Sequence, residues 1–192
     1  GQREGGVTLG MEHHIHHNGA SGLGFDTTSG GSVSKCVGNR IHDNHLVGVG
    51  IQKGWDVQLV GNEISRSGGM PPLVMIFEGS HAELTDNQLT GGGVASIRCA
   101  GSVLIEGNVI NPDASSQGGR GPSSAIWALP GAEVVAHGNE FLGWRKALLA
   151  SGAKVIASQN RGFALHAKPF QIDKSVPGSR IGNNNIGTSS NE

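Results

Sequence analysis

Apolar and polar residues alternate along much of this chain in short blocks. In the stretch Val57-Gln58-Leu59-Val60-Gly61-Asn62-Glu63-Ile64, Val57 and Leu59 are two residues apart, and Gly61-Asn62 interrupts the alternation before Ile64. A spacing of two is typical of a β-strand, whose successive side chains point to opposite faces. Another strand precedes this block and is followed by a small residue. In this repeat the strand contains Val49 and Ile51, and the small residue is Gly54. The pattern therefore predicts three short strands in each repeat, with turns at Gly and Asn.

One asparagine marks the same place in every repeat. The aligned residues are Asn39, Asn62, Asn87, Asn108, Asn139, Asn160 and Asn184, with His13 at the head of the series. By subtraction, their successive spacings are 26, 23, 25, 21, 31, 21 and 24 residues. A period near 24 is typical of a solenoid, in which each repeat buries its apolar face only by stacking on its neighbours.

The apolar residues fall into columns when the repeats are aligned on this asparagine, and we expect the columns to point inward. Five residues before it stand Val57, Ala82, Val103, Val134 and Val155. Three before it stand Cys36, Leu59, Leu84, Ile105, Ala136, Ala157 and Ile181. Two after it stand Ile15, Ile41, Ile64, Leu89, Ile110, Phe141 and Ile186, with Gly162 the exception.

Stacking these columns places parallel strands about 4.8 Å apart. The asparagine suits its turn because it tolerates left-handed backbone, and its amide can pair with the coils above and below. Parallel crossovers favour the right hand. The predicted fold class is therefore all-β, a right-handed parallel β-helix of about seven to eight coils.

The repeated Val-x-Leu-x-Gly-Asn-x-Ile resembles the parallel β-helix repeat of the pectate-lyase-like right-handed β-helix superfamily, over roughly residues 7 to 186. The resemblance implies the fold, and a secreted or cell-surface location. It implies no single function, because lyases, hydrolases, epimerases, phage tailspikes and non-catalytic binders share the fold. It implies Ca²⁺ as a cofactor if the chain is lyase-like.

Composition and length narrow the picture further. We expect a single domain over residues 1–186, either alone or as part of a longer protein, and a disordered polar tail over residues 187–192. A net charge of −1 offers no basic stripe for nucleic acid. The longest apolar run, Leu73 to Phe77, has the length of a strand, so we find no signal peptide or membrane span. Cys36 and Cys99 lie coils apart, so we expect both to be free.

Histidines are concentrated in the first two repeats. His16 and His42 each lie three positions after the reference residue, and the next column holds His17, Asp43 and Arg66. Imidazole, carboxylate and guanidinium on one face could abstract a proton and neutralise a sugar carboxylate, as uronate lyases and epimerases require. We predict His16, His42, Asp43 and Arg66 as catalytic residues and His45 as a substrate-binding residue. The alternative is a solvated turn in which His and Asp cap backbone groups.

The same histidines are also candidate metal ligands. Because His13-His14-Ile15-His16-His17 should alternate sides on a strand, at most His14 and His16 would share a face, with His42 and His45 as possible partners. No carboxylate and Cys set at structural-zinc spacing accompanies them. We therefore predict no metal site and expect only adventitious metal binding.

A second candidate segment is Arg120-Gly121-Pro122-Ser123-Ser124-Ala125. It resembles part of the Arg-x-Pro-x-x-Arg segment of pectate lyases, which implies that Arg120 takes the role of the proton-abstracting Arg of those enzymes. We predict Arg120 as a substrate-binding residue. The closing Arg of that segment is Ala125 here, so the alternative is a plain Gly-Pro turn.

An apolar stripe should lie outside the strand that precedes each tight turn. With Ala147 and Leu149 pointing inward, the outward residues would be Met75, Phe77, Trp127, Leu129 and Leu148. Such patches mark partner surfaces or sugar platforms, unless a loop covers them. We predict Trp127 as a sugar-stacking residue.

Two functions follow from these residues. The first is a carbohydrate-binding or carbohydrate-active protein whose partner is a polysaccharide lying across several coils. The second is a non-catalytic structural or interaction module of a larger surface or phage-associated protein. The absence of a recognisable cap sequence and the apolar stripe motivate the second, with protein contact end to end or side by side through uncapped coils.

Overall fold

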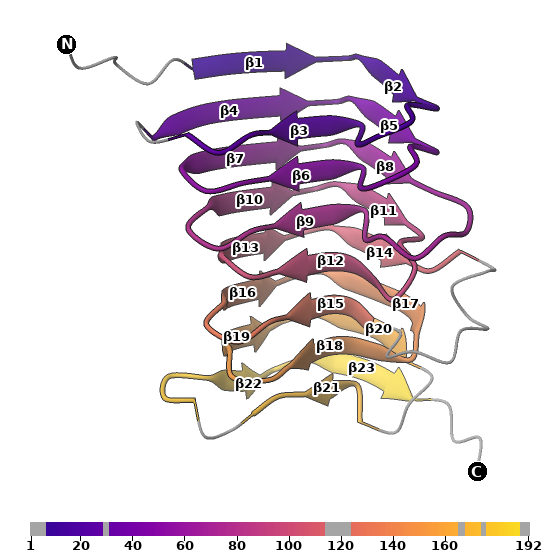
Figure 1. Ribbon diagram of the computed structural model, residues 1–192. Helices are drawn as coiled ribbons and strands as arrows, with labels where there is room; N and C mark the ends of the chain where they lie inside the picture. The colour runs from indigo at the N-terminus through magenta and orange to yellow at the C-terminus, as the bar shows by residue number, and fades with distance from the viewer. Residues whose placement is uncertain (1–6, 29–30, 114–123, 165–167, 174–175, 189–192) are drawn as a thin grey trace.

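The computed structural model of this chain describes residues 7–28, 31–113, 124–164, 168–173 and 176–188. Every regular element in these ranges is a β-strand, and the strands wind into a solenoid with three parallel sheets (Figure 1). Seven coils carry three strands each, and an eighth carries two. The predicted parallel β-solenoid and its number of coils are therefore confirmed. Among the described residues, no helix has the length and apolar character needed to cross a membrane.

Each sheet takes one strand from every coil. Sheet A contains β1 (Val7–Met11), β4 (Ser32–Val37), β7 (Trp55–Val60), β10 (His81–Thr85), β13 (Ser102–Glu106), β16 (Glu133–His137), β19 (Lys154–Ser158) and β22 (Arg180–Gly182). Sheet B contains β2 (His14–His16), β5 (Arg40–His42), β8 (Glu63–Ser65), β11 (Gln88–Thr90), β14 (Val109–Asn111), β17 (Glu140–Trp144), β20 (Arg161–Ala164) and β23 (Asn185–Thr188). Sheet C contains β3 (Leu23–Phe25), β6 (Val49–Ile51), β9 (Val74–Ile76), β12 (Ala95–Cys99), β15 (Ser124–Ala128), β18 (Lys146–Ala150) and β21 (Phe170–Gln171). Strand β23 extends to Thr188, so regular structure reaches two residues into the segment expected to be a tail.

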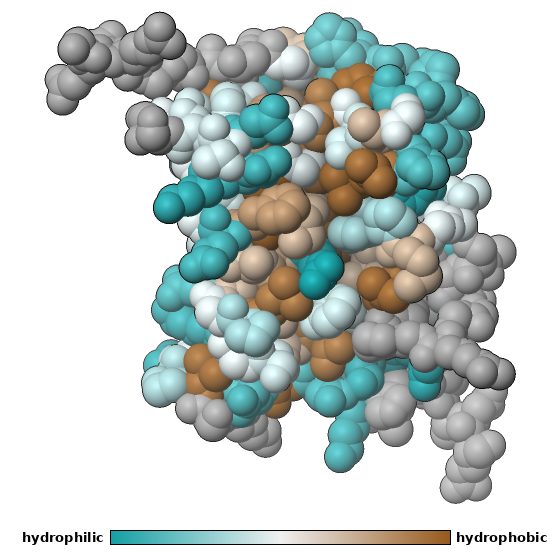
Figure 2. All heavy atoms as spheres, viewed as in Figure 1, coloured by the Kyte–Doolittle hydropathy of each residue, from teal (hydrophilic) through white to brown (hydrophobic). Residues whose placement is uncertain are grey.

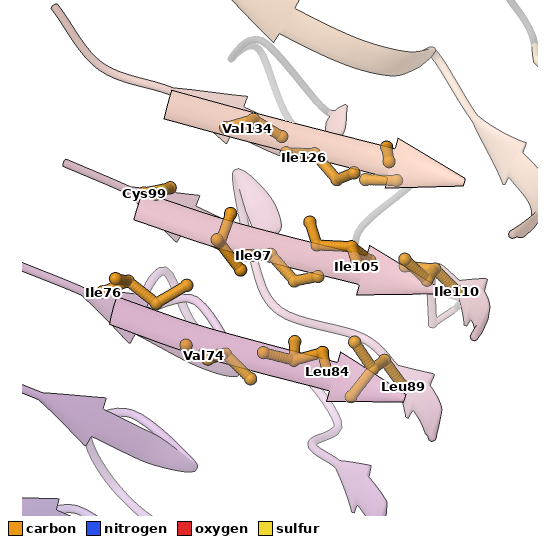
Figure 3. Close-up of a cluster of buried hydrophobic side chains, with 14 of the residues drawn as sticks. Val74, Ile76, Leu84, Leu89, Ile97, Cys99, Ile105, Ile110, Ile126 and Val134 are labelled. Atoms are coloured by element: carbon orange, nitrogen blue, oxygen red, sulfur yellow. The ribbon is translucent and has the colours of Figure 1, made fainter. Parts of the chain in front are cut away.

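The core consists of the predicted columns. Val103 in β13 pairs with Ala82 on one side and Val134 on the other, and all three are at most 2% exposed. Figure 3 shows these columns meeting between the sheets, with aliphatic side chains of successive coils packed on one another. Burial of each such side chain contributes roughly 1.5–3 kcal/mol. Ile181, in the last coil, departs from the pattern because it is 38% exposed.

The asparagines form a continuous ladder of hydrogen bonds. In a typical step, the backbone N–H and the side-chain Nδ2 of Asn62 both donate to Asn87 Oδ1, at 2.8 and 2.9 Å. Asn87 Nδ2 in turn donates to the Leu59 carbonyl oxygen. The predicted amide pairing is therefore confirmed. The left-handed backbone, however, belongs to the preceding residue, as at Gly61 and Asp86, and not to the asparagine. The asparagine is selected for its two-sided amide and not for its φ angle.

The register of β18 differs from the prediction. Leu148 pairs with Ile126 and is fully buried, whereas Leu149 pairs with Trp127 on the outer face. The prediction assumed strict alternation from Ala147, but Ala147 and Leu148 are both buried, as Ala125 and Ile126 are in β15. The residue where the chain enters sheet C also faces the core, so alternation starts one position later than assumed.

Both cysteines are buried and free, as predicted. Burial raises the pKa of the Cys99 thiol to about 12 and also raises that of Cys36. Both side chains therefore act as small apolar core residues.

Gly162, the exception in the third column, is required by its backbone. Its φ is 126°, and a Cβ there would collide with the Phe141 carbonyl oxygen. We expect Gly162→Ala to destabilise the protein by about 3 kcal/mol, since backbone strain and a clash combine. Chemical denaturation would measure this loss.

Gly61→Ala is the matched control for that substitution. Gly61 also has a positive φ of 61°, but an added Cβ would meet nothing within 4 Å. Gly61→Ala should lower the free energy of unfolding by about 1 kcal/mol. Equal losses for the two variants would contradict the close approach at Gly162.

Candidate functional site

A line of polar side chains crosses five coils on the outer face of sheet B. Each member pairs in register with the next: His16, His42, Ser65, Thr90 and Asn111. We call this line the polar track. Adjacent parallel strands are about 4.8 Å apart, so the polar track presents one hydrogen-bonding side chain per coil along the axis.

Four imidazole rings gather at the start of the polar track. His16 and His42 are stacked, with 4.9 Å between ring centroids and 11° between planes. His14 and His17 each lie 5.9 Å from His42, nearly perpendicular to it. The structure thus places His16 and His42 in adjacent coils, as the alignment predicted.

His42 is paired with Asp43. Their Nδ1 and Oδ2 atoms are 3.0 Å apart, and the other carboxylate oxygen accepts from the Ser67 backbone N–H at 3.4 Å. The hydrogen bond from His42 holds the pKa of Asp43 below its usual range, although burial acts in the opposite direction. Asp43 therefore stays ionised at neutral pH and orients the imidazole, leaving His42 Nε2 available for proton transfer.

The lowered pKa of Asp43 predicts a pH dependence of stability. A carboxyl group whose pKa is lower in the folded protein stabilises the fold above its ordinary value of about 3.9, and this contribution is lost as the pH falls through the folded value. We expect Asp43→Asn to lose less stability than the wild type between about pH 6 and pH 3. Thermal melts across this range would show the difference.

Asp86→Asn is the control, because Asp86 shares the left-handed backbone of Asp43. This variant shows what the loss of a carboxylate at a left-handed position does to stability by itself, and the Asp43→Asn profile is compared with it. An unchanged profile for Asp43→Asn would show that the pair with His42 does not stabilise the fold.

Arg66 lies in the column of Asp43, but its side chain is turned into the protein. It is 7% exposed and donates to the carbonyl oxygens of Leu46 and Gly68. Burial lowers the pKa of its guanidinium, while Asp113 and Asp43 counteract that effect. Asp113 also accepts from the Gly68 backbone N–H at 2.8 Å. Arg66 therefore fixes two turns and presents little of its charge to solvent.

Two hollows flank Arg66 at the edge of sheet B. The His45 hollow, of about 420 Å³, is lined by Asp43, Asn44, His45, Leu46, Arg66, Ser67, Gly68, Gly69, Met70 and Pro71. The Glu63 hollow, of about 280 Å³, is lined by Asp43, Glu63, Ser65, Arg66, Ser67, Thr90 and Asp113. The two share Asp43, Arg66 and Ser67, so they adjoin the polar track near its middle.

The predicted site residues are thus partly assembled. His16, His42, Asp43, His45 and Arg66 lie together at the first coils of sheet B. Trp127 lies on sheet C, where the Arg98 guanidinium covers its ring at 4.8 Å from the centroid. A sugar could stack on that face only by displacing Arg98. Arg120 lies outside the described residues.

Sequence reasoning missed most of the polar track. Ser65, Thr90 and Asn111 each follow the reference asparagine by three residues, as His16 and His42 do. The same alignment that selected the histidines would therefore have found them. Asp113 follows β14 in a loop, and only the folded chain shows its contact with Gly68.

The geometric reason given against a metal site was wrong in one respect. His17 has a φ of 52°, which turns its ring toward His16, and their Nδ1 atoms are 2.8 Å apart. Strand alternation therefore does not separate these two rings. Even so, no group of three or more His, Cys, Asp or Glu side chains in the described part of the chain is arranged to hold a metal ion.

Comparison with known proteins addresses the fold. Neither a search of curated proteins nor a search of solved structures found a match. A family model described as a right-handed β-helix region matches residues 5–166, which is most of the chain. The match agrees with the three parallel sheets and with the handedness expected from the crossover rule. The chain therefore belongs to the right-handed β-helix family.

Proposed function

We propose that this protein binds a polysaccharide along the polar track of sheet B. The observation that carries the proposal is one polar side chain per coil, from His16 to Asn111, beside two hollows. A surface with one hydrogen-bonding side chain per coil suits a repeating ligand. Each further sugar unit can bind within a complex that has already formed, so the entropy cost of association is not incurred again. The hydroxyl, amide and imidazole groups match the hydrogen-bonding chemistry of sugars.

Catalysis on the bound glycan would centre on His42. Asp43 fixes Nδ1 of the imidazole, so Nε2 is the atom that would accept a proton. Uronate lyase or epimerase chemistry also needs positive charge at the sugar carboxylate. Arg66, the residue predicted for that role, is 7% exposed and bonded to backbone oxygens. Polysaccharide binding therefore has more support than uronate lyase or epimerase chemistry. Ca²⁺ is expected as a cofactor only if lyase activity is found.

Calorimetric titration against a panel of neutral and acidic oligosaccharides tests the proposal. We expect one class to bind, and His42→Ala to weaken that binding about tenfold, as expected for loss of a central hydrogen-bonding contact. His81→Ala, on the outer face of sheet A, is the control and should bind like the wild type. In parallel, the absorbance of unsaturated products would report lyase turnover. If no glycan binds, the proposal is wrong.

A second candidate is a protein-interaction module, favoured by the outer face of sheet C. Met75, Trp127 and Leu149 are half-buried on that face, and Phe77 beside it is 40% exposed. Figure 2 shows apolar residues gathered over this face, with hydrophilic residues along both sides. Sedimentation of the wild type and Trp127→Asp would test this candidate, since an interface on sheet C predicts association that the variant loses.

A further inference from the structure

We propose that the Glu63 hollow selects a neutral, hydroxyl-rich sugar unit and disfavours an acidic one. This inference rests on the proposed function, and it names the substrate class at one place on the polar track. It follows from the charges that line the hollow and from the position of Arg66.

The lining of the hollow carries an excess of acceptors. Among the described residues of the lining, Asp43, Glu63 and Asp113 contribute three carboxylates and Arg66 one guanidinium, which gives these residues a net charge of −2. Arg40, which is not part of this lining, pairs with Glu63. Ser65 and Thr90 add hydroxyl groups from two successive coils of the polar track. Carboxylates accept hydrogen bonds and donate none when ionised, so they pair with sugar hydroxyls and repel a sugar carboxylate.

Arg66 does not reverse this preference. Two of its N–H groups are directed to the carbonyl oxygens of Leu46 and Gly68, and the side chain is 7% exposed. Its Nη2 has no hydrogen-bond partner among the described residues. This nitrogen is buried, so a ligand in the hollow would reach it only if the Arg66 side chain moved. Arg66 therefore offers an acidic ligand little of its charge, and Asp113 and Asp43 lie close enough to interact with that charge.

Glu63 is the carboxylate best suited to a test. It lies in β8, and its Oε2 atom is 3.5 Å from Arg40 Nε. Because both side chains are about half exposed, this ion pair contributes little to stability. Asp43 and Asp113, in contrast, hold backbone N–H groups of the neighbouring turn. Glu63→Gln therefore changes the charge of the hollow with little risk to the fold.

The test compares neutral hexose oligosaccharides with oligouronates of equal length, at about pH 8, where imidazoles are generally neutral. At low ionic strength we expect the best neutral ligand to bind at least about tenfold more tightly than the best oligouronate, because like charges face each other. Salt at about 1 M should narrow this ratio by screening the repulsion. Glu63→Gln should lower the ratio by about threefold or more through the loss of one charge.

Glu140→Gln is the matched control. Glu140 lies in sheet B and pairs with Arg161 at 3.1 Å, as Glu63 pairs with Arg40, but it is outside the hollow. The ratio of neutral to acidic oligosaccharide affinity of Glu140→Gln should equal that of the wild type. Equal or tighter binding of the oligouronate overturns this inference and leaves the proposed function standing. A ratio that responds neither to salt nor to Glu63→Gln also overturns it, because shape would then set the preference. If neither class binds, the proposed function is wrong, and this inference falls with it.

Discussion

Replacing Ile105 with aspartate should unfold the protein. Ile105 lies in β13, the central region of sheet A, and has no exposed surface. The variant would lose the burial of an aliphatic side chain and place an unpaired carboxylate between stacked coils. Together these effects should cost about 5 kcal/mol or more, against a total stability of roughly 5–15 kcal/mol for a protein domain. Circular dichroism and denaturant titration would report the loss of the native state.

Leu104→Asp is the control on the same strand. Leu104 precedes Ile105 and is half-buried on the outer face, where an introduced carboxylate stays hydrated. Its cost should be about 1 kcal/mol, the typical effect of a single substitution. Comparable destabilisation at both positions would contradict the inward column.

Replacing Asn108 with alanine should have the next largest effect. Asn108 is fully buried, and its Oδ1 accepts from the backbone N and the Nδ2 of Asn87, both at 2.8 Å. Its Nδ2 donates to the Leu84 carbonyl oxygen and to Asn139 Oδ1. Each buried group left without a partner costs about 1–3 kcal/mol, so we expect a total loss of about 4 kcal/mol. Denaturant titration would measure it.

Asn184→Ala tests the same interaction at the end of the ladder. Asn184 is half-buried, and water can replace its amide when the side chain is removed. A loss of about 1 kcal/mol is therefore expected. If the two substitutions cost the same, the ladder does not depend on exclusion of water.

The repeat does not determine which side chains stand on the outside of the solenoid. The inward columns and the asparagines must recur for the coils to stack, whereas outward positions such as Gln88 and Arg161 are free to vary. A family match to the fold therefore identifies the scaffold without identifying the ligand. The experiments above test whether the polar track and the Glu63 hollow bind a ligand.

Aligning the repeats gave the wrong position for two features of the solenoid itself. It placed Leu148 outward because it counted alternation from Ala147, but the register of β18 is set by its pairing with β15. It likewise assigned the left-handed turn to the asparagine, although Gly61 and Asp86 carry it. Both errors concern corners, where the chain passes from one sheet to the next and the period of two is interrupted.

The sequence by itself determined the solenoid, its number of coils and the inward columns. It could do so because stacking requires every coil to repeat the same apolar positions, and that requirement is written in the spacing of residues such as Leu59, Leu84 and Ile105. Only the tertiary structure decided where the polar side chains point. Arg66 turns inward to two carbonyl oxygens, and His17 turns toward His16 through a left-handed backbone. The contact of Arg66 with Leu46 joins two coils, and no local spacing encodes it. The direction of the His17 ring depends on a left-handed backbone angle that a period of two does not predict.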